Sequence, residues 1–132
     1  MGRNSLGLPY FLPEYSKMSV KRINVGPRMS DVVIHNGVAY LAGKVPSSTT
    51  GDIGEQTVDV LRTIDKLLAE AGTSKANLLR AEIFLTSMSD FAGMNKVWDA
   101  WVDPKATPAR ATVEAKLARP DYKIEIVITA AV

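Results

Sequence analysis

The C-terminal part of the chain alternates apolar and polar residues with a period of two. Residues 108–117 and 122–128 both follow this pattern, which is typical of β-strands with one buried face. Between them, residues 118–121 read Ala-Arg-Pro-Asp and can turn the chain, so the two strands are predicted to pair as a hairpin. This pairing would place the cation of Arg110 and the carboxylate of Glu125 on neighbouring strands of one sheet.

Three further stretches are predicted to be extended. Residues 20–25 form a short first strand, and residues 78–86 alternate again. Residues 31–43 are the clearest hairpin signal, because Asn36-Gly37 at their centre tolerates the positive φ angles of a tight type I′ turn. Residues 44–54 are rich in Ser, Thr, Gly and Pro and are predicted to be a loop.

Two stretches repeat apolar residues at spacings of three and four, which predicts amphipathic helices. The first covers residues 55–71 and stops at Gly72. The second begins after a cap at Ser89 or Asp90 and ends at Asp103-Pro104. Its apolar positions are Phe91, Met94, Val97, Trp98 and Trp101. We expect the two tryptophans to pack in the core or at an interface rather than to stack on bases.

The predicted order is β-ββ-α-β-α-ββ, which favours an α+β fold with both helices on one face of a mixed six-stranded sheet. The other face is then expected to carry Arg110, Thr112, and Glu114 or Val127. A sheet face that is half apolar and half polar favours a subunit interface with an ionisable patch.

The length of 132 residues suits one domain with its own core. Residues 1–17 show no period and are interrupted by Gly, Pro and Ser, so we interpret them as an extension or leader, expected to be disordered. Residues 18–132 are then predicted to form a single domain. The sequence shows neither an apolar run long enough to span a membrane nor a signal peptide, so a cytoplasmic location is expected.

Composition excludes several classes of chemistry. The net charge is +2, from 16 basic and 14 acidic residues, which is too balanced to indicate a nucleic-acid partner. The sequence has no cysteine, so disulfides, thiol catalysis and cysteine-bound metals are excluded. The single histidine, His35, excludes a His-cluster metal site and is expected to be an exposed turn residue. We therefore predict neither a metal nor an organic cofactor.

Short motifs then point to a known family, whose order and spacing they follow. They are Gly26-Pro27, Ala42-Gly43-Lys44-Val45-Pro46, Glu55-Gln56-Thr57, Ala71-Gly72, Asp90-Phe91-Ala92-Gly93-Met94-Asn95, Pro108-Ala109-Arg110-Ala111-Thr112-Val113-Glu114 and Ile124-Glu125-Ile126. Together these motifs resemble the reactive intermediate deaminase (RidA/YjgF) family, from about Ser19 to the C-terminus. The resemblance implies a chorismate-mutase-like fold, a homotrimer with clefts between subunits, and cofactor-independent hydrolysis of reactive 2-imino and enamine acids to 2-oxo acids and ammonia.

The resemblance also implies a role for individual residues. Arg110 would bind the substrate carboxylate, and Glu125 would position the attacking water. Gly43 would supply a backbone contact, and Asn95 would lie at the cleft, although a helix-surface amide is an equal reading of Asn95. The residues themselves suit these roles, because arginine binds carboxylates with two parallel hydrogen bonds and glutamate can act as a general base. Thr112 could hydrogen-bond the same water or substrate.

The chain departs from the family pattern at three positions. Arg28 stands where the family has a tyrosine that covers the substrate, Lys44 where a glutamine is common, and Thr112 where a cysteine is frequent. If Arg28 and Lys44 both face the cleft, the preferred substrate should carry a second anionic group, as in an iminosuccinate-like dicarboxylate.

Other interpretations stay open at this point. Alternating Arg and Glu on strands are commonly exposed cross-strand pairs with no chemical role. A trimeric protein that binds 2-oxo acids or other small carboxylates without catalysis would use the same arginine. RNA cleavage is a weaker alternative, since the sequence has no histidine pair and no clustered basic run.

Overall fold

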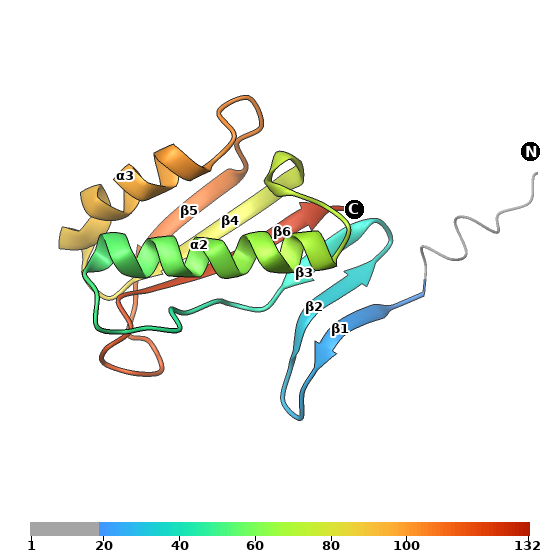
Figure 1. Ribbon diagram of the computed structural model, residues 1–132, viewed down its shortest axis with the longest axis horizontal. Helices are drawn as coiled ribbons and strands as arrows, with labels where there is room; N and C mark the ends of the chain where they lie inside the picture. The colour runs from blue at the N-terminus through green and yellow to red at the C-terminus, as the bar shows by residue number, and fades with distance from the viewer. Residues whose placement is uncertain (1–18) are drawn as a thin grey trace, which may run out of the picture.

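The computed structural model describes residues 19–132 (Figure 1). The predicted extension at residues 1–17 lies outside the described residues. The described part contains a single sheet whose strands are β1 (Lys21–Val25), β2 (Ser30–His35), β3 (Val38–Leu41), β4 (Leu78–Leu85), β5 (Ala109–Glu114) and β6 (Ile124–Ala131). The strands lie in the order β1-β2-β3-β6-β4-β5, and every neighbouring pair is antiparallel except the parallel pair β4 and β5. The predicted mixed six-stranded sheet is therefore confirmed.

The first part of the sheet folds as the local sequence indicates. The turn between β2 and β3 has positive φ at both central residues, 51° at Asn36 and 77° at Gly37. These are the angles of a type I′ turn, whose twist matches that of the flanking strands. The predicted hairpin over residues 31–43 is confirmed, with Val33 paired to Tyr40 and Ile34 to Ala39.

Two helices cover one face of the sheet. They are α2 (Ile53–Glu70) and α3 (Phe91–Trp101), and the 3₁₀ turns η1 (Lys75–Asn77) and η2 (Met88–Asp90) precede β4 and α3. α2 begins two residues earlier than predicted because Asp52 caps it, accepting a hydrogen bond of 2.9 Å from the Glu55 backbone N–H. Asp90 is the residue before α3, as predicted, but its side chain makes no capping hydrogen bond.

The core lies between these helices and the sheet, as Figure 1 shows from the helix side. Its members alternate along the strands and recur at helical spacing along α2, so both periods seen in the sequence serve one interior. The largest fully buried side chains include Ile64, Leu68, Ile83, Leu85, Met94, Ile124, Ile126 and Ile128. Within residues 19–132 no helix covers the opposite face, which we call the open face.

The predicted pairing of the last two strands is wrong. β5 pairs with β4 in parallel, and β6 lies on the other side of β4, antiparallel to both β4 and β3. The reason is the helix between β4 and β5. A strand, a helix that packs on the sheet and a second strand form a crossover unit, which brings the second strand back parallel to the first. Residues 115–123 then carry the chain past β4, and alternation within a strand gives no information about this partner choice.

The predicted face of three side chains is also wrong. Arg110 pairs with Ala81, Thr112 with Ile83, and Glu114 with Leu85. Their partners on β4 are buried under the helices, so Arg110, Thr112 and Glu114 lie on the helix-covered face.

The open face carries a different set of residues. Glu125 pairs with Phe84, and Val127 pairs with Glu82, so both point away from the helices, as predicted for Val127. Tyr40 and Val113 also lie on this face and are 50% and 47% exposed.

The buried side-chain amide of Gln56, on α2, holds the loop before β6 against this helix. Its loss should destabilise the protein. Gln56 is fully buried, donates a 3.0 Å hydrogen bond to the Asp121 carbonyl and accepts one of 2.8 Å from the Lys123 N–H. Gln56→Leu keeps the volume but leaves both backbone groups unpaired, so it should lower the free energy of unfolding by about 2 kcal/mol. Urea unfolding at fixed protein concentration measures this.

Val58→Leu on the same helix is the matched control, since Val58 is 43% exposed. It should change the free energy of unfolding by no more than about 0.5 kcal/mol. Equal stability of the two variants would contradict the role given to Gln56.

Candidate functional site

The guanidinium of Arg110 is held between β5 and α3 by two aromatic rings. Its central carbon Cζ lies 5.4 Å from the ring centroid of Trp98 and 6.0 Å from that of Phe91. Rings at this range attract a cation through their negative faces. Trp98 is 5% exposed, so it is a fixed part of the core, whereas Phe91 is 38% exposed. Within residues 19–132 the guanidinium has no carboxylate partner, so its hydrogen-bond donors remain free for a ligand.

Two polar side chains accompany Arg110 on this side of the sheet. Thr112 lies two residues further along β5 on the same face, and its buried hydroxyl oxygen is without a hydrogen-bond partner in the described part of the chain. Buried hydroxyls are normally satisfied, so an unpaired one beside a free guanidinium is consistent with a ligand contact. Asn95 stands one helical turn from both Phe91 and Trp98 and therefore shares their side of α3.

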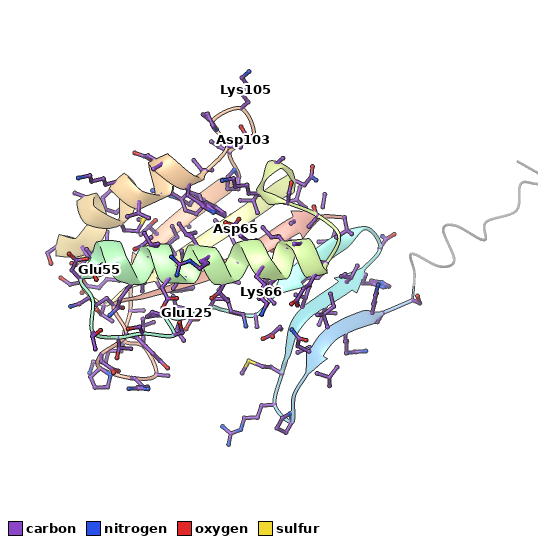
Figure 2. All side chains as sticks on the ribbon, in the orientation of Figure 1. Glu55, Asp65, Lys66, Asp103, Lys105 and Glu125 are labelled. Carbon is purple, nitrogen blue, oxygen red and sulfur yellow. The ribbon has the colours of Figure 1, made fainter. Side chains whose placement is uncertain are left out.

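Glu125 lies apart from these residues, on the open face of the sheet. Its carboxylate lies against Gly43, in the segment that follows β3, and Figure 2 labels Glu125 beside this connection. The backbone of this segment is fixed to β6, because Lys44 and Ile126 exchange hydrogen bonds of 2.9 and 3.0 Å. Glu125 is half-buried, and among residues 19–132 no side chain or backbone group donates to its carboxylate.

Lys44 and Arg28, the two cations that depart from the family pattern, point to neither Arg110 nor the Glu125 carboxylate. The Lys44 ammonium donates to Asp31 at 2.6 Å, and the Asn24 amide donates to the same carboxylate at 3.0 Å. The hydrogen bond from Lys44 holds the pKa of Asp31 below its ordinary value, and the one from Asn24 adds to this. Lys44 is thereby committed to Asp31. Arg28 is exposed in the turn between β1 and β2.

The predicted site residues therefore form two groups rather than one. Arg110, Thr112 and Asn95 lie together on the helix side, and Gly43 and Glu125 lie together on the open face. Opposite faces of one sheet cannot present their side chains to one small molecule. The two groups can act on the same substrate only if a second copy of the chain brings its open face to the helix-side group of the first.

Sequence reasoning missed the parts that Phe91 and Trp98 play around Arg110. It assigned Trp98 to packing because of its helical spacing. The spacing correctly indicates a buried face, but it contains no signal that an arginine from a distant strand lies against the rings. Only the parallel pairing of β4 and β5 brings Arg110 under α3.

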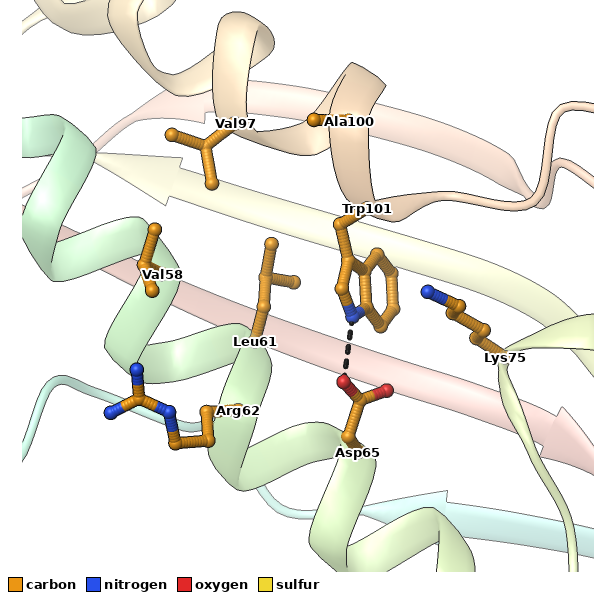
Figure 3. Close-up of a pocket in the computed structure, with 8 residues that line it drawn as sticks. All are labelled: Val58, Leu61, Arg62, Asp65, Lys75, Val97, Ala100 and Trp101. Atoms are coloured by element: carbon orange, nitrogen blue, oxygen red, sulfur yellow. Dashed lines mark hydrogen bonds between the residues drawn. The ribbon is translucent and has the colours of Figure 1, made fainter.

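A shallow groove follows the seam between α2 and α3 on the outer surface (Figure 3). Trp101 donates to the Asp65 carboxylate at 3.0 Å there, and the Lys75 ammonium lies 5.3 Å from its ring centroid. None of the predicted site residues lines this groove. The described residues also contain no cluster of three or more His, Cys, Asp or Glu that could hold a metal ion. No helix among residues 19–132 is long and apolar enough to cross a membrane.

Comparison with known proteins agrees with this architecture. Residues 20–132 match the family model described as Endoribonuclease L-PSP. The chain is 54% identical over 114 residues to a RutC family protein of Haemophilus influenzae, covering 86% of this chain and 98% of that protein. It is 49% identical over 115 residues to the RutC family protein YoaB of Escherichia coli, covering 87% of this chain and all of that protein (100%).

Solved structures lead to the same result. A crystal structure of a YjgF family member from Neisseria meningitidis superposes with a TM-score of 0.85 at 50% identity, covering 87% of this chain and 96% of that chain. The resemblance and the chorismate-mutase-like fold predicted from the sequence are confirmed. The chain belongs to the Endoribonuclease L-PSP family, which includes the RutC and YjgF proteins.

Proposed function

We propose that this protein is a hydrolase that deaminates reactive 2-imino and enamine acids to 2-oxo acids and ammonia, in clefts between the subunits of a homotrimer. The observation that carries the proposal is the free guanidinium of Arg110, held between Phe91 and Trp98 beside the unpaired hydroxyl of Thr112. Membership of the YjgF-type family supports a function of this kind.

Arg110 is the proposed anchor for the substrate carboxylate. Its planar fork donates two parallel hydrogen bonds to a carboxylate, a geometry that the ammonium of a lysine cannot match. The aromatic rings restrict the orientation of the fork, so less conformational freedom is lost when the substrate binds. Thr112 and Asn95 are the proposed hydrogen-bonding partners for the reacting end of the substrate, because they share the side of the sheet on which Arg110 lies.

Glu125 of a second subunit is the proposed base for the attacking water. The open face that carries Glu125 also carries half-exposed Tyr40 and Val113, and apolar surface of this kind favours association between copies. Gly43 would offer its backbone N–H to the substrate beside this carboxylate.

The reaction then needs only proton transfers and one water. Glu125 takes a proton from the water while the water oxygen bonds to the carbon of the protonated imine, which gives a neutral carbinolamine. Glu125 returns this proton to the nitrogen, and the carbon–nitrogen bond breaks. As the carbonyl forms, Glu125 takes the hydroxyl proton and passes it to the departing ammonia, which leaves as ammonium. General-base assistance of this type contributes about 10²–10⁴ in rate. Apart from the substrate and one water, this route uses only side chains and backbone groups of the protein.

The name of the matched family model refers to RNA cleavage, but the residues of this chain favour imine chemistry. Transesterification of RNA needs an acid and a base at one phosphate, together with cations along the strand. The single histidine, His35, is exposed at the end of β2, next to the turn. The second candidate is a non-catalytic trimer that binds small carboxylates. In such a protein the same Arg110 would bind the carboxylate. The two candidate functions are distinguished by whether the protein turns over imines.

Replacing the anchor tests the proposed function. An amino-acid oxidase generates imines in the presence of semicarbazide, and a deaminase lowers the semicarbazone signal by hydrolysing them. Arg110→Ala should lower kcat/KM by about 10²–10³ because the carboxylate loses its charged partner. Arg62→Ala, an exposed arginine on α2, should behave as wild type, and both variants should keep the wild-type oligomeric state.

Full activity in a folded Arg110→Ala protein would contradict the anchor assignment. Saturable binding of 2-oxo acids by the wild type without any turnover, across aliphatic, aromatic and acidic amino acids, would favour the binding-protein alternative.

Arg28 generates a separate prediction about substrate preference. It is exposed in the β1–β2 turn, whereas Lys44 is already paired with Asp31, so Arg28 is the cation left to meet a second anionic group. Arg28→Ala should lower kcat/KM for an iminosuccinate-like dicarboxylate by up to about fivefold, the effect of one lost exposed ion pair. Activity on aliphatic imines should stay unchanged. An equal effect on both substrate types would contradict this role for Arg28.

A further inference from the structure

Gly43 lies where the carboxylate of Glu125 needs room. A Cβ atom built on Gly43 would overlap Oε2 of Glu125 and would lie 3.0 Å from its Cδ and 3.3 Å from its Cγ. Non-bonded carbon atoms have their optimal separation at about 3.5–4.0 Å. The space that any other side chain at position 43 would occupy is therefore already filled by the end of Glu125.

Backbone conformation is not the reason for glycine at this position. The glycines with positive φ in the described residues are Gly37 and Gly72, so Gly43 adopts angles that an alanine also adopts. Contact with Glu125 is what distinguishes the position.

The neighbours of Gly43 determine which of them would move if a side chain were added at position 43. Lys44 and Ile126 exchange two backbone hydrogen bonds, which fix the segment of Gly43 to β6, and β6 is an interior strand between β3 and β4. The Glu125 side chain, in contrast, has flexible torsions and no hydrogen bond to hold it within residues 19–132. A methyl group at position 43 would therefore displace the carboxylate, not the strand.

We propose that Gly43 is a positioning residue whose missing side chain lets the Glu125 carboxylate lie across the sheet, in the orientation from which it directs the attacking water. This inference rests on the proposed function, in which Glu125 is the base. It gives Gly43 a role separate from a backbone contact to substrate, because Gly43→Ala keeps the backbone N–H and removes only the clearance.

Gly43→Ala should lower kcat by about 10- to 100-fold, a large part of the usual contribution of a general base. The Kd for a 2-oxo acid, which depends on Arg110, should stay within about twofold, and the Tm should stay within about 3 °C. A loss of kcat without loss of affinity or stability is not expected from a merely structural glycine.

Gly54→Ala is the matched control. Gly54 lies in the first turn of α2, and a Cβ there would have Asp52 Oδ1 at 3.3 Å and Val97 Cγ2 at 3.9 Å as its nearest neighbours. Because this position contacts neither group of the candidate site, kcat should equal that of the wild type.

Two further measurements separate the possible outcomes. In a double-mutant cycle, Gly43→Ala added to Glu125→Ala should cause no further loss, since both changes remove the same directed carboxylate. A crystal structure of Gly43→Ala should show the Glu125 side chain in a different rotamer.

An additive loss in the cycle, or an unmoved Glu125 in that crystal structure, would overturn the inference. So would wild-type kcat in Gly43→Ala when Glu125→Ala is inactive. Full activity of Glu125→Ala would instead overturn the assignment of Glu125 as the base, whereas absence of turnover in the wild type would overturn the proposed function itself.

Discussion

Side chains alternate along β4 and its two neighbours, and this alternation decides which residues of the protein can meet. Ala81, paired with Arg110 on one side, is buried under the helices, whereas Phe84, paired with Glu125 on the other side, points to the open face. Because side chains alternate strictly between the two faces of a strand, one residue cannot change face unless the whole strand shifts in register. Arg110 and Glu125 are therefore fixed on opposite faces of the sheet. One chain therefore presents two separate groups of candidate site residues, and the proposed chemistry depends on assembly.

Each of the two groups of residues is held in place by a different kind of contact. On the helix side, packing of α3 against β5 places Phe91 and Trp98 around the Arg110 guanidinium, so a part of the hydrophobic core also orients a cation. On the open face, the constraint is steric, because Glu125 lies in the space that a side chain on Gly43 would fill. The Asp31 and Lys44 pair lies outside both groups and serves to fix the segment that carries Gly43.

Local sequence patterns predicted the elements well, because the signals for them are local. Asn36-Gly37 determines its own turn, and the apolar spacing along residues 55–71 requires a helix with one buried face. Alternation alone does not give the partners of β5 and β6, because it is the same whichever neighbour a strand has; the signal for the parallel pairing is the helix between β4 and β5. Arg110 lies on the unexpected face for another reason: the apolar residues that alternate with it, such as Val113, point to the open face, where Val113 is 47% exposed. The family motifs point to the same candidate site residues whichever face these occupy, because a motif carries no information about which subunit or face supplies each residue.

The proposed mechanism requires Arg110 and Glu125 to act on one substrate from two different subunits. Co-expression of Arg110→Ala and Glu125→Ala chains with different tags, followed by purification through both tags, yields mixed oligomers. In a mixed oligomer of the proposed trimeric form, one of the clefts combines the intact Arg110 of one chain with the intact Glu125 of its neighbour, so turnover should recover to about a third of the wild-type value although each parent is nearly inactive. Mixed oligomers that stay as inactive as both parents would contradict the account, because such a result requires both residues to act from the same chain.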